Sequence, residues 1–415
     1  MHLLRTTIRP YAWGSRTVIA ELQGRPTPSA EPEAELWVGA HPSAPSRLPP
    51  DWSAAGGADD GVALHDAIEA EPEELLGAGV LGRFGPRLPY LLKFLAAEQP
   101  LSLQAHPDAE QAAAGFAAEE AAGEAAAAPW RNYVDPWHKP ELLVAVSDFE
   151  ALCGFRPPAQ AGQVLAAFNV PALQPVVDTL QGAGPEPEAL RNAVHQLMAW
   201  PVEERAALVG AVAKAAAGGW AIFGGRADGE RVAAAFELAG RLAEAYPGDV
   251  GVIVALLLNH VRLRPGEAVW MPAGNLHAYL RGTGVEIMAA SDNVLRGGLT
   301  PKHVDVAELL RVLRFEALRD PVVRPEPVAG AGSLSTWPAP VPEFRLFRAD
   351  LSGATAAVTL PADGPRSLIC TGGRVTLRSG AESMALDAGQ AAFVPAGMPA
   401  VEATGTGTLF QAGTP

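Results

Sequence analysis

The sequence has few cysteines and no long hydrophobic run, and both absences limit where the protein can work. Its two cysteines, Cys153 and Cys370, each lie inside an apolar stretch and form no C-x-x-C pair. We interpret them as structural thiols in a reducing compartment. No segment reaches the roughly 18 consecutive apolar residues that a membrane helix needs, and the first residues contain no apolar signal core. These features predict a cytoplasmic protein with no membrane partner.

Basic residues are also scarce relative to acidic ones. The chain has 31 lysines and arginines against 46 aspartates and glutamates, which gives a net charge of −15 at pH 7. This balance argues against a surface that binds nucleic acid or anionic membranes. A phosphorylated substrate would therefore need a local basic pocket rather than an overall positive field.

The length and the hydrophobic pattern indicate several domains. The chain has 415 residues, of which 48% are hydrophobic and 19% are charged, as is usual for a globular protein. Residues 156–248 have apolar residues at helical spacing, and we expect helices at 190–200, 202–217 and 228–246. Short strands are expected on both sides of this segment, resuming at 250–258. The segment is therefore interpreted as a helical insertion in a mainly β chain.

One stretch predicts a β-hairpin that carries a metal-capable side chain. Residues 266–277 read G-x5-P-x-G-x2-H, in which an alternating strand at 268–271 leads into a tight turn and a second strand begins at His277. Residues 389–400 align with this stretch without gaps, but Ala400 stands where the first copy has His277. The repeat indicates two related β-barrels, one with a ligand at its hairpin and one without.

Further candidate ligands lie far upstream of the hairpin. Gln104 and His106 have a spacing of two, which points both side chains to the same face of a strand. Glu141 stands immediately before the apolar run LLVAV. With His277 they offer two imidazoles, one carboxylate and one amide oxygen, which suit a divalent ion such as zinc with a position left for water or substrate. Each residue also has a plain structural reading, as a buried polar group with satisfied hydrogen bonds.

Charged residues follow His277 at short intervals. They are Glu286, Asp292, Arg296 and Lys302. The segment from Arg296 to Lys302, RGGLTPK, combines two cations with backbone amides left open by glycine. Arginine can grip a phosphate in bidentate fashion, whereas lysine acts as a point charge. The alternative reading of this segment is a solvated loop without a ligand.

Short blocks of sequence spread over nearly the whole chain carry a resemblance to a known family. They read YAWGS, ELWVGAHPSAPS, LPYLLKFL, LSLQAHPD, HKPELLVAV, ALCGF, MPAGNLHAYL, VEIMAASDNVLRGGLTPKHVDV and PVPEF. In this order they are similar to the type I mannose-6-phosphate isomerase (phosphomannose isomerase) family. Ala105, Trp137 and Gly298 depart from the family pattern, but none of them replaces a candidate ligand.

The resemblance implies a fold that is mainly β with a helical insertion: a bicupin of two jelly-roll β-barrels plus an all-α domain. The predicted boundaries are 1–155 and 249–318 for the catalytic cupin, 156–248 for the helical insertion and 319–415 for a metal-free C-terminal cupin. It also implies one zinc ion per chain on the four candidate ligands, and reversible conversion of mannose 6-phosphate to fructose 6-phosphate. The expected partner is this phosphosugar, and we expect a monomer, with a dimer left open.

Such an isomerisation moves a proton between C2 and C1 through an enediol. Arg296 is predicted to act at the reacting carbons, because an always-charged guanidinium stabilises an enediolate. Glu286 is placed ahead of Asp292 as the proton carrier, since the strand V-E-I-M would turn it to one face with Gly284 and Met288. The predicted substrate-binding residues are Lys302, Lys93, Ser102, Lys139 and Tyr279.

Two alternatives from other classes are kept. The first is a sugar-binding bicupin without turnover, against which the retention of the ligands with Arg296 and Lys302 argues. The second is an iron-dependent cupin oxygenase, which also uses two histidines and a carboxylate. Gln104 and the cationic pair favour a phosphosugar, and metal analysis with an oxygen-uptake assay separates the two.

Overall fold

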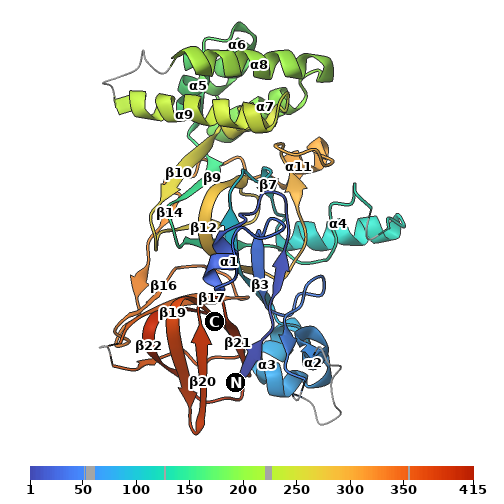
Figure 1. Cartoon of the computed structure of the whole chain (residues 1–415). Helices are drawn as coiled ribbons and strands as arrows, with labels where there is room; N and C mark the ends of the chain where they lie inside the picture. Colours follow the sequence, from blue (N-terminus) through green and yellow to red (C-terminus); the bar gives the residue numbers. More distant parts are fainter. Residues whose placement is uncertain (51, 53–60, 126–127, 220–226, 354–355) are drawn as a thin grey trace.

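The computed structural model describes residues 1–415 except 51, 53–60, 126–127, 220–226 and 354–355. The chain is mainly β-sheet with helices. Figure 1 shows a group of helices at one end, one large sheet in the middle and a second large sheet at the other end. Within the described ranges, no helix is both long and apolar enough to cross a membrane.

The middle sheet contains the strands of the predicted site. Its hydrogen-bonded order is β14-β11-β8-β12-β6-β3-β2, and β7, β9, β10 and β13 pair beside this path. Its strands are β2 (Thr7–Arg9), β3 (Glu35–Val38), β6 (Tyr90–Ala97), β7 (Gln104–Ala105), β8 (Glu141–Ala145), β9 (Phe149–Phe155), β10 (Leu258–Leu263), β11 (Ala268–Met271), β12 (His277–Ala289), β13 (Leu295–Arg296) and β14 (Val322–Val323). The predicted strand at 268–271 and the strand beginning at His277 are confirmed as β11 and β12. The predicted hairpin is wrong, because β8 lies between these two strands and pairs with both of them. A tight turn and an alternating pattern identify the strands but not their partners in the sheet.

The second sheet is built mostly from the last ninety residues or so of the chain. Its order is β1-β21-β19-β22-β17-β16-β15, with β18 beside β22 and β20 beside β19. The strands are β1 (His2–Leu4), β15 (Glu326–Pro327), β16 (Leu334–Thr336), β17 (Arg345–Ser352), β18 (Val358–Thr359), β19 (Arg366–Ser379), β20 (Glu382–Asp387), β21 (Ala391–Val394) and β22 (Glu402–Gly413). The N-terminal strand β1 pairs with β21 and so lies in this second sheet. A small separate ribbon is formed by β4 (Arg47–Leu48) and β5 (Val62–Ala63).

The helices occur mainly as one run in the middle of the chain. This run contains α5 (Pro158–Ala167), the 3-10 helix Pro171–Leu173, α6 (Gln174–Gln181), α7 (Glu186–Met198), α8 (Val202–Gly219), α9 (Ala227–Ala245) and α10 (Gly251–Ala255). The others are α1 (Val18–Leu22), α2 (Leu64–Ala70), α3 (Pro72–Phe84), α4 (Ala109–Ala121) and α11 (Val306–Val312). The three expected helices in the insertion are confirmed as α7, α8 and α9.

The strand expected at 250–258 is wrong. The chain forms α10 there, and the next strand begins only at Leu258. A short continuous apolar run fits a buried strand and a buried helix equally well, so periodicity could not separate them. Asp249 favours the helix, because its carboxylate accepts a hydrogen bond of 2.7 Å from the backbone N–H of Gly251 at the helix start.

Buried apolar side chains hold the site strands on both sides. One hydrophobic core joins the helical run to the middle sheet and includes Leu103 and Leu276, the neighbours of two candidate ligands. Another core lies between the two sheets and includes Leu92, Ile287 and Phe393. Because packed side chains restrict the backbone, the ligand-bearing strands are held in place by both cores.

The two repeated strand–turn segments, 266–277 and 389–400, have matching backbone contacts in the two sheets. The backbone N–H of Gly266 donates to the carbonyl of Ala145, and that of Gly389 donates to the carbonyl of Cys370, both at 2.8 Å. The turns themselves differ. Gly274 has a φ of 76°, and a side chain at this position would meet a backbone carbonyl at 2.9 Å. Only glycine suits this turn, which leads directly to the first strand residue of β12.

Candidate active site

Three of the candidate ligands converge in the middle sheet. The ligand atoms of His106, Glu141 and His277 all lie within 4.8 Å of one another. The Nε2 atom of His106 is 3.3 Å from Glu141 Oε1, and the Nε2 atom of His277 is 3.2 Å from Glu141 Oε2. Strand register adds the fourth ligand, since Gln104 lies directly opposite His277 across β7 and β12. The side chains of Gln104 and His277 therefore lie on the same face of neighbouring strands, and His106 follows β7 directly.

The hydrogen bonds of the two histidines fit them for a metal ion. The Nδ1 atom of His106 lies 2.7 Å from the carbonyl of Asn293, and that of His277 lies 3.0 Å from the carbonyl of Asn275. A carbonyl can only accept, so each Nδ1 carries the proton and each Nε2 presents a lone pair. Both lone pairs face the Glu141 carboxylate, and this group of electron-rich atoms is favourable only around a cation. Within the described chain, the buried His106 Nε2 has no hydrogen-bond partner.

The protonation states also suit metal binding. Burial lowers the pKa of His106 to about 4, which keeps the imidazole neutral. Burial opposes ionisation of Glu141, but the positive charge that His106 gains in the acid range and the Lys139 ammonium together hold the pKa of this carboxyl well below its usual range. The Lys139 Nζ atom is 3.3 Å from Glu141 Oε1. Neutral imidazoles and an ionised carboxylate are the forms that bind a divalent ion.

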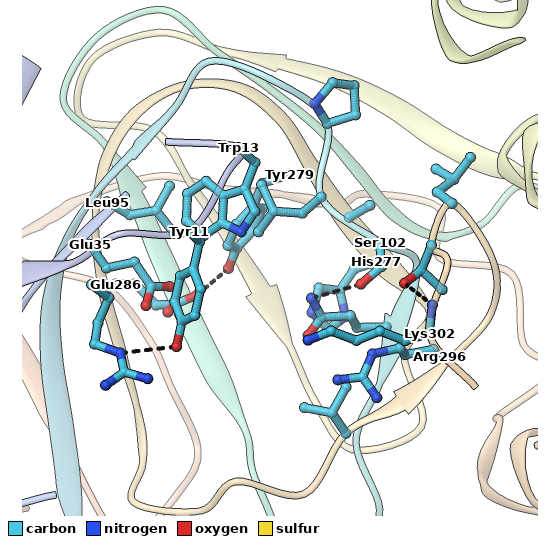
Figure 2. Close-up of a pocket in the computed structure, with 18 of the residues that line it drawn as sticks. Tyr11, Trp13, Glu35, Leu95, Ser102, His277, Tyr279, Glu286, Arg296 and Lys302 are labelled. Atoms are coloured by element: carbon cyan, nitrogen blue, oxygen red, sulfur yellow. Dashed lines mark hydrogen bonds between the residues drawn. The ribbon is translucent and has the colours of Figure 1, made fainter. Parts of the chain in front are cut away.

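A cavity of about 760 Å³ opens beside these ligands. It is lined by every residue that the sequence predicted for the site except His106, which is buried behind the others. Figure 2 shows two groups of side chains facing each other across it: Glu35, Glu286 and Tyr279 on one side, and Ser102, His277, Arg296 and Lys302 on the other. A cavity of this size holds a small polar metabolite.

The first side of the cavity is a row of buried charges. Glu286, Lys93 and Trp37 lie directly opposite one another on β12, β6 and β3, so their side chains share a face. The Lys93 Nζ atom is 3.0 Å from Glu286 Oε2 and 3.5 Å from Glu35 Oε1. The Tyr279 hydroxyl donates to Glu286 Oε1 at 2.6 Å. Burial raises the pKa of Glu286, as do the nearby carboxylates, and Lys93 opposes this shift.

The second side carries cations without counter-ions. Arg296 lies on β13 opposite Gln104 on β7, one strand from the metal ligands. In the described part of the chain, neither Arg296 nor Lys302 forms an ion pair with a carboxylate. Burial lowers the pKa of both groups, and Arg296 lowers the pKa of Lys302 further. Two partly desolvated cations side by side favour binding of an anion between them.

Several residues of the site were missed at the level of sequence. Glu35 and Trp37 have a spacing of two on one strand, and the Trp37 indole N–H donates to Glu35 Oε2 at 2.7 Å. The spacing of two was the feature of the sequence that could have identified this pair. Asn275 and Asn293 act through backbone carbonyls, which leave no trace in residue type. His41 lies in the same wall, in contact with the predicted residue Asp292.

Buried nitrogen and carboxylate ligands next to a cavity with two free cations define a metal-dependent enzyme with a small anionic ligand. Residues 1–158 match the family model for the phosphomannose isomerase type I catalytic domain. The chain is 39% identical over 416 residues to mannose-6-phosphate isomerase of Escherichia coli K12, with 99% of each chain covered. It is 31% identical over 413 residues to mannose-6-phosphate isomerase 2 of Arabidopsis thaliana, covering 95% of this chain and 88% of that protein.

A solved structure agrees with these relatives over the full length. The crystal structure of mannose 6-phosphate isomerase from Salmonella typhimurium, bound to fructose 6-phosphate and zinc, has a TM-score of 0.86 at 35% identity. The match covers 100% of this chain and 99% of that one. The chain therefore belongs to the type I mannose-6-phosphate isomerase family and is an isomerase.

Proposed function

We propose that the chain interconverts mannose 6-phosphate and fructose 6-phosphate in the 760 Å³ cavity. The observation that carries this proposal is the combination, in one cavity, of a buried His-Glu-His set with two uncompensated cations, Arg296 and Lys302. The first suits a metal that contacts sugar oxygens, and the second suits a phosphate. Membership of the family supplies the reaction that joins them.

The finer architecture is part of this proposal. The middle sheet forms the catalytic cupin, and the helices α5 to α10 form an all-α domain inserted into it. The second sheet forms a cupin without a metal. The matching strand–turn segments 266–277 and 389–400 support a common origin for the two barrels. The pairing of β1 with β21 means that the second barrel includes residues from the N-terminus.

One zinc ion is held by Gln104, His106, Glu141 and His277. When bound, zinc supplies a Lewis acid that polarises the carbonyl and hydroxyl oxygens of the sugar. The Gln104 amide nitrogen donates to Ser102 Oγ at 3.4 Å, so the amide oxygen remains available for the ion.

The phosphate binds on the cationic side of the cavity. Lys302 and Ser102 contact it, and Arg296, which is closer along the sheet to the metal ligands, stabilises the oxyanion of the enediol. Lys93 has a different role from the predicted one, because its ammonium already lies between Glu35 and Glu286. It compensates these buried carboxylates and leaves the phosphate to the other side.

Asp292 carries the proton between C1 and C2. Both oxygens of Glu286 already accept hydrogen bonds, from Lys93 and from Tyr279, and its side chain is 3% exposed. The Asp292 side chain is 43% exposed and lines the cavity. A proton carrier must reach the substrate, so the contacts favour Asp292 over Glu286, the reverse of the order inferred from the sequence.

A coupled assay tests this function. Purified, metal-analysed protein is incubated with mannose 6-phosphate, and fructose 6-phosphate is followed before chelation, after chelation and after zinc is restored. We expect turnover, its loss and its recovery. Absence of turnover by the zinc-loaded protein would refute the function, and full turnover after complete chelation would refute the role of the metal.

A further inference from the structure

His41 lies behind Asp292 in the wall of the cavity. The His41 side chain is 6% exposed, and its Nε2 atom is 3.4 Å from Asp292 Oδ1. Asp292 lines both the main cavity and a neighbouring one of about 390 Å³, to which His41 also contributes. The carboxylate therefore stands between two cavities, with a buried imidazole beside it.

The surroundings of His41 determine which nitrogen carries its proton. The backbone N–H of Ser43 donates to His41 Nδ1 at 3.3 Å, and the Ser43 hydroxyl is 2.9 Å from the same atom. A backbone N–H can only donate, so Nδ1 presents a lone pair and the neutral ring carries its proton on Nε2. The ring packs edge-on against Trp37, with centroids 5.1 Å apart, which fixes its orientation. The Nε2–H therefore faces Asp292.

The charges around His41 keep it neutral. Burial lowers the pKa of His41, Lys93 and Lys139 lower it further, and Asp292 and Asp135 oppose the shift. A proton added at Nδ1 would also displace the hydrogen bond from Ser43. These effects favour the neutral imidazole, whose Nε2–H can act as a donor.

We propose that His41 is a positioning residue that orients the Asp292 carboxylate for proton transfer. The backbone N–H of Asp292 donates to Asp135 Oδ2 at 2.8 Å, and its Oδ1 lies 3.4 Å from His41 Nε2. Among the described residues, Oδ2 of Asp292 has no partner, so this oxygen is left for the substrate. The proposal rests on the proposed function for its kinetic consequence, but the pairing of the two side chains is testable without turnover.

The kinetic test compares three variants. His41→Leu removes the donor, and we expect kcat to fall roughly tenfold to a hundredfold with little change in KM, since a misplaced catalytic group costs this much. His41→Gln retains a donor and should recover much of the rate. His65→Leu is the matched control, since His65 pairs with Asp66 at 2.9 Å away from the main cavity, and it should behave as wild type.

A spectroscopic test compares wild type with Asp292→Asn and does not depend on activity. Long-range ¹H–¹⁵N spectra of imidazole nitrogens should show wild-type His41 with a protonated Nε2, and Asp292→Asn should shift that resonance. A His41 proton on Nδ1, or a resonance unmoved by Asp292→Asn, would overturn the proposal. So would a His41→Leu enzyme with the kcat of wild type. If wild type shows the expected tautomer but no turnover, the proposed function fails while the pairing stands.

Arg366 carries a second, independent inference about the barrel without a ligand. In the middle sheet Glu141 is opposite Met271, the residue before Pro272 in the first repeated segment. In the second sheet Arg366 is opposite Val394, the residue before the matching proline. Arg366 therefore occupies the register position that the metal-ligating carboxylate has in the first barrel.

The contacts of Arg366 replace those of a metal site. The residue is fully buried, and its Nη2 donates to the carbonyls of Pro395 at 3.1 Å and Met398 at 2.8 Å. Its Nη1 donates to the carbonyl of Pro399 at 3.4 Å. No ion pair is formed by this guanidinium within the described residues. We infer that Arg366 links its strand by hydrogen bonds to the repeated turn of the second barrel, at the place where the first barrel would use the metal and its ligands.

Hydrogen exchange measured peptide by peptide tests how each of the two repeated turns, 272–277 and 395–400, is stabilised. In wild type, chelation should speed exchange in residues 272–277 and leave residues 395–400 unchanged. Arg366→Met should speed exchange in 395–400 roughly tenfold or more, because it removes hydrogen bonds from a charged donor, and leave 272–277 unchanged. Arg366→Lys, which keeps the charge, serves if the first variant does not fold, and should fall between. Unchanged exchange in 395–400 in the variants would overturn the inference. So would an equal rise of the exchange rate in 272–277 and 395–400 on chelation.

Discussion

Replacing Lys93 with methionine should destabilise the folded protein by about 3–5 kcal/mol, the usual cost of removing one partner from a buried ion pair. The Lys93 side chain is 8% exposed, and its partners Glu286 and Glu35 are 3% and 8% exposed. Methionine fills a similar volume, so the loss reflects charge rather than packing. A change of this size is a large fraction of the 5–15 kcal/mol that typically holds a protein folded.

Urea unfolding of the zinc-loaded proteins, followed by tryptophan fluorescence, measures this loss. Lys93→Met/Glu286→Gln should regain part of the stability, because the double change removes the nearer of the two carboxylates that lose their counter-ion and leaves only Glu35 unpaired. Lys139→Met is the matched control. Lys139 has Glu141 as its carboxylate partner, and that carboxylate keeps a cation when zinc is bound, so a smaller loss is expected.

The pH dependence gives the sign of the effect. In Lys93→Met, Glu286 loses the cation that lowers its pKa, while burial, Glu141 and Glu35 still raise it. A carboxyl whose pKa is higher in the folded state favours folding while it is protonated. The variant should therefore lose stability as the pH rises through that folded-state pKa, by up to about 1.4 kcal/mol per pH unit. An unfolding midpoint equal to that of wild type, or a double variant no more stable than the single one, would refute the reasoning.

The remaining predictions concern the phosphate, the turn and the metal-free site. Lys302→Met should raise KM for mannose 6-phosphate roughly tenfold with kcat nearly kept, whereas Arg296→Met should mainly lower kcat; the opposite split in steady-state kinetics would exchange their roles. Gly274→Ala should cost about 1–3 kcal/mol and weaken zinc binding, whereas Gly397→Ala, in the matching turn with open space around it, should be tolerated; titration calorimetry and unfolding curves distinguish them. Metal-free protein should lose stability as the pH falls from about 6.5 to about 4, because unfolded His106 gains a proton before the folded one does; His106→Asn should flatten that slope.

The two strands and the turn of residues 266–277 could be predicted from sequence because they rest on short-range rules, whereas the complete ligand set was implied by the family resemblance. Period-two spacing places Gln104 and His106 on one face, and the P-x-G turn delivers His277 at the start of a strand. The residues downstream were also brought to one cavity. The separate role of each of these residues could not be predicted, because it depends on which side chains contact one another across neighbouring strands. Glu286 looked like a free carboxylate until Lys93 was placed opposite it.

Long-range pairing accounts for the other differences. Glu35 belongs to the site only because β3 lies beside β6, and nothing within its own segment reports that neighbour. The apolar run at 250–258 begins with a helix, where the Asp249 carboxylate accepts a hydrogen bond from the backbone N–H of Gly251, and its residues are buried in the core that joins the helices to the middle sheet. Such outcomes are decided by tertiary packing, which overrides local preference.

The pairing of β1 with β21 has a consequence for how the polypeptide reaches its final form. Residues 2–4 are synthesised long before residues 391–394, with which they pair. Domains generally fold as units while the chain is being made, but the second sheet cannot gain this pairing until residues 391–394 have been made. Synthesis interrupted before that point would leave an uncovered strand edge, which is a site for aggregation. A fusion tag placed directly before residue 2 would therefore disturb the second sheet rather than the middle sheet.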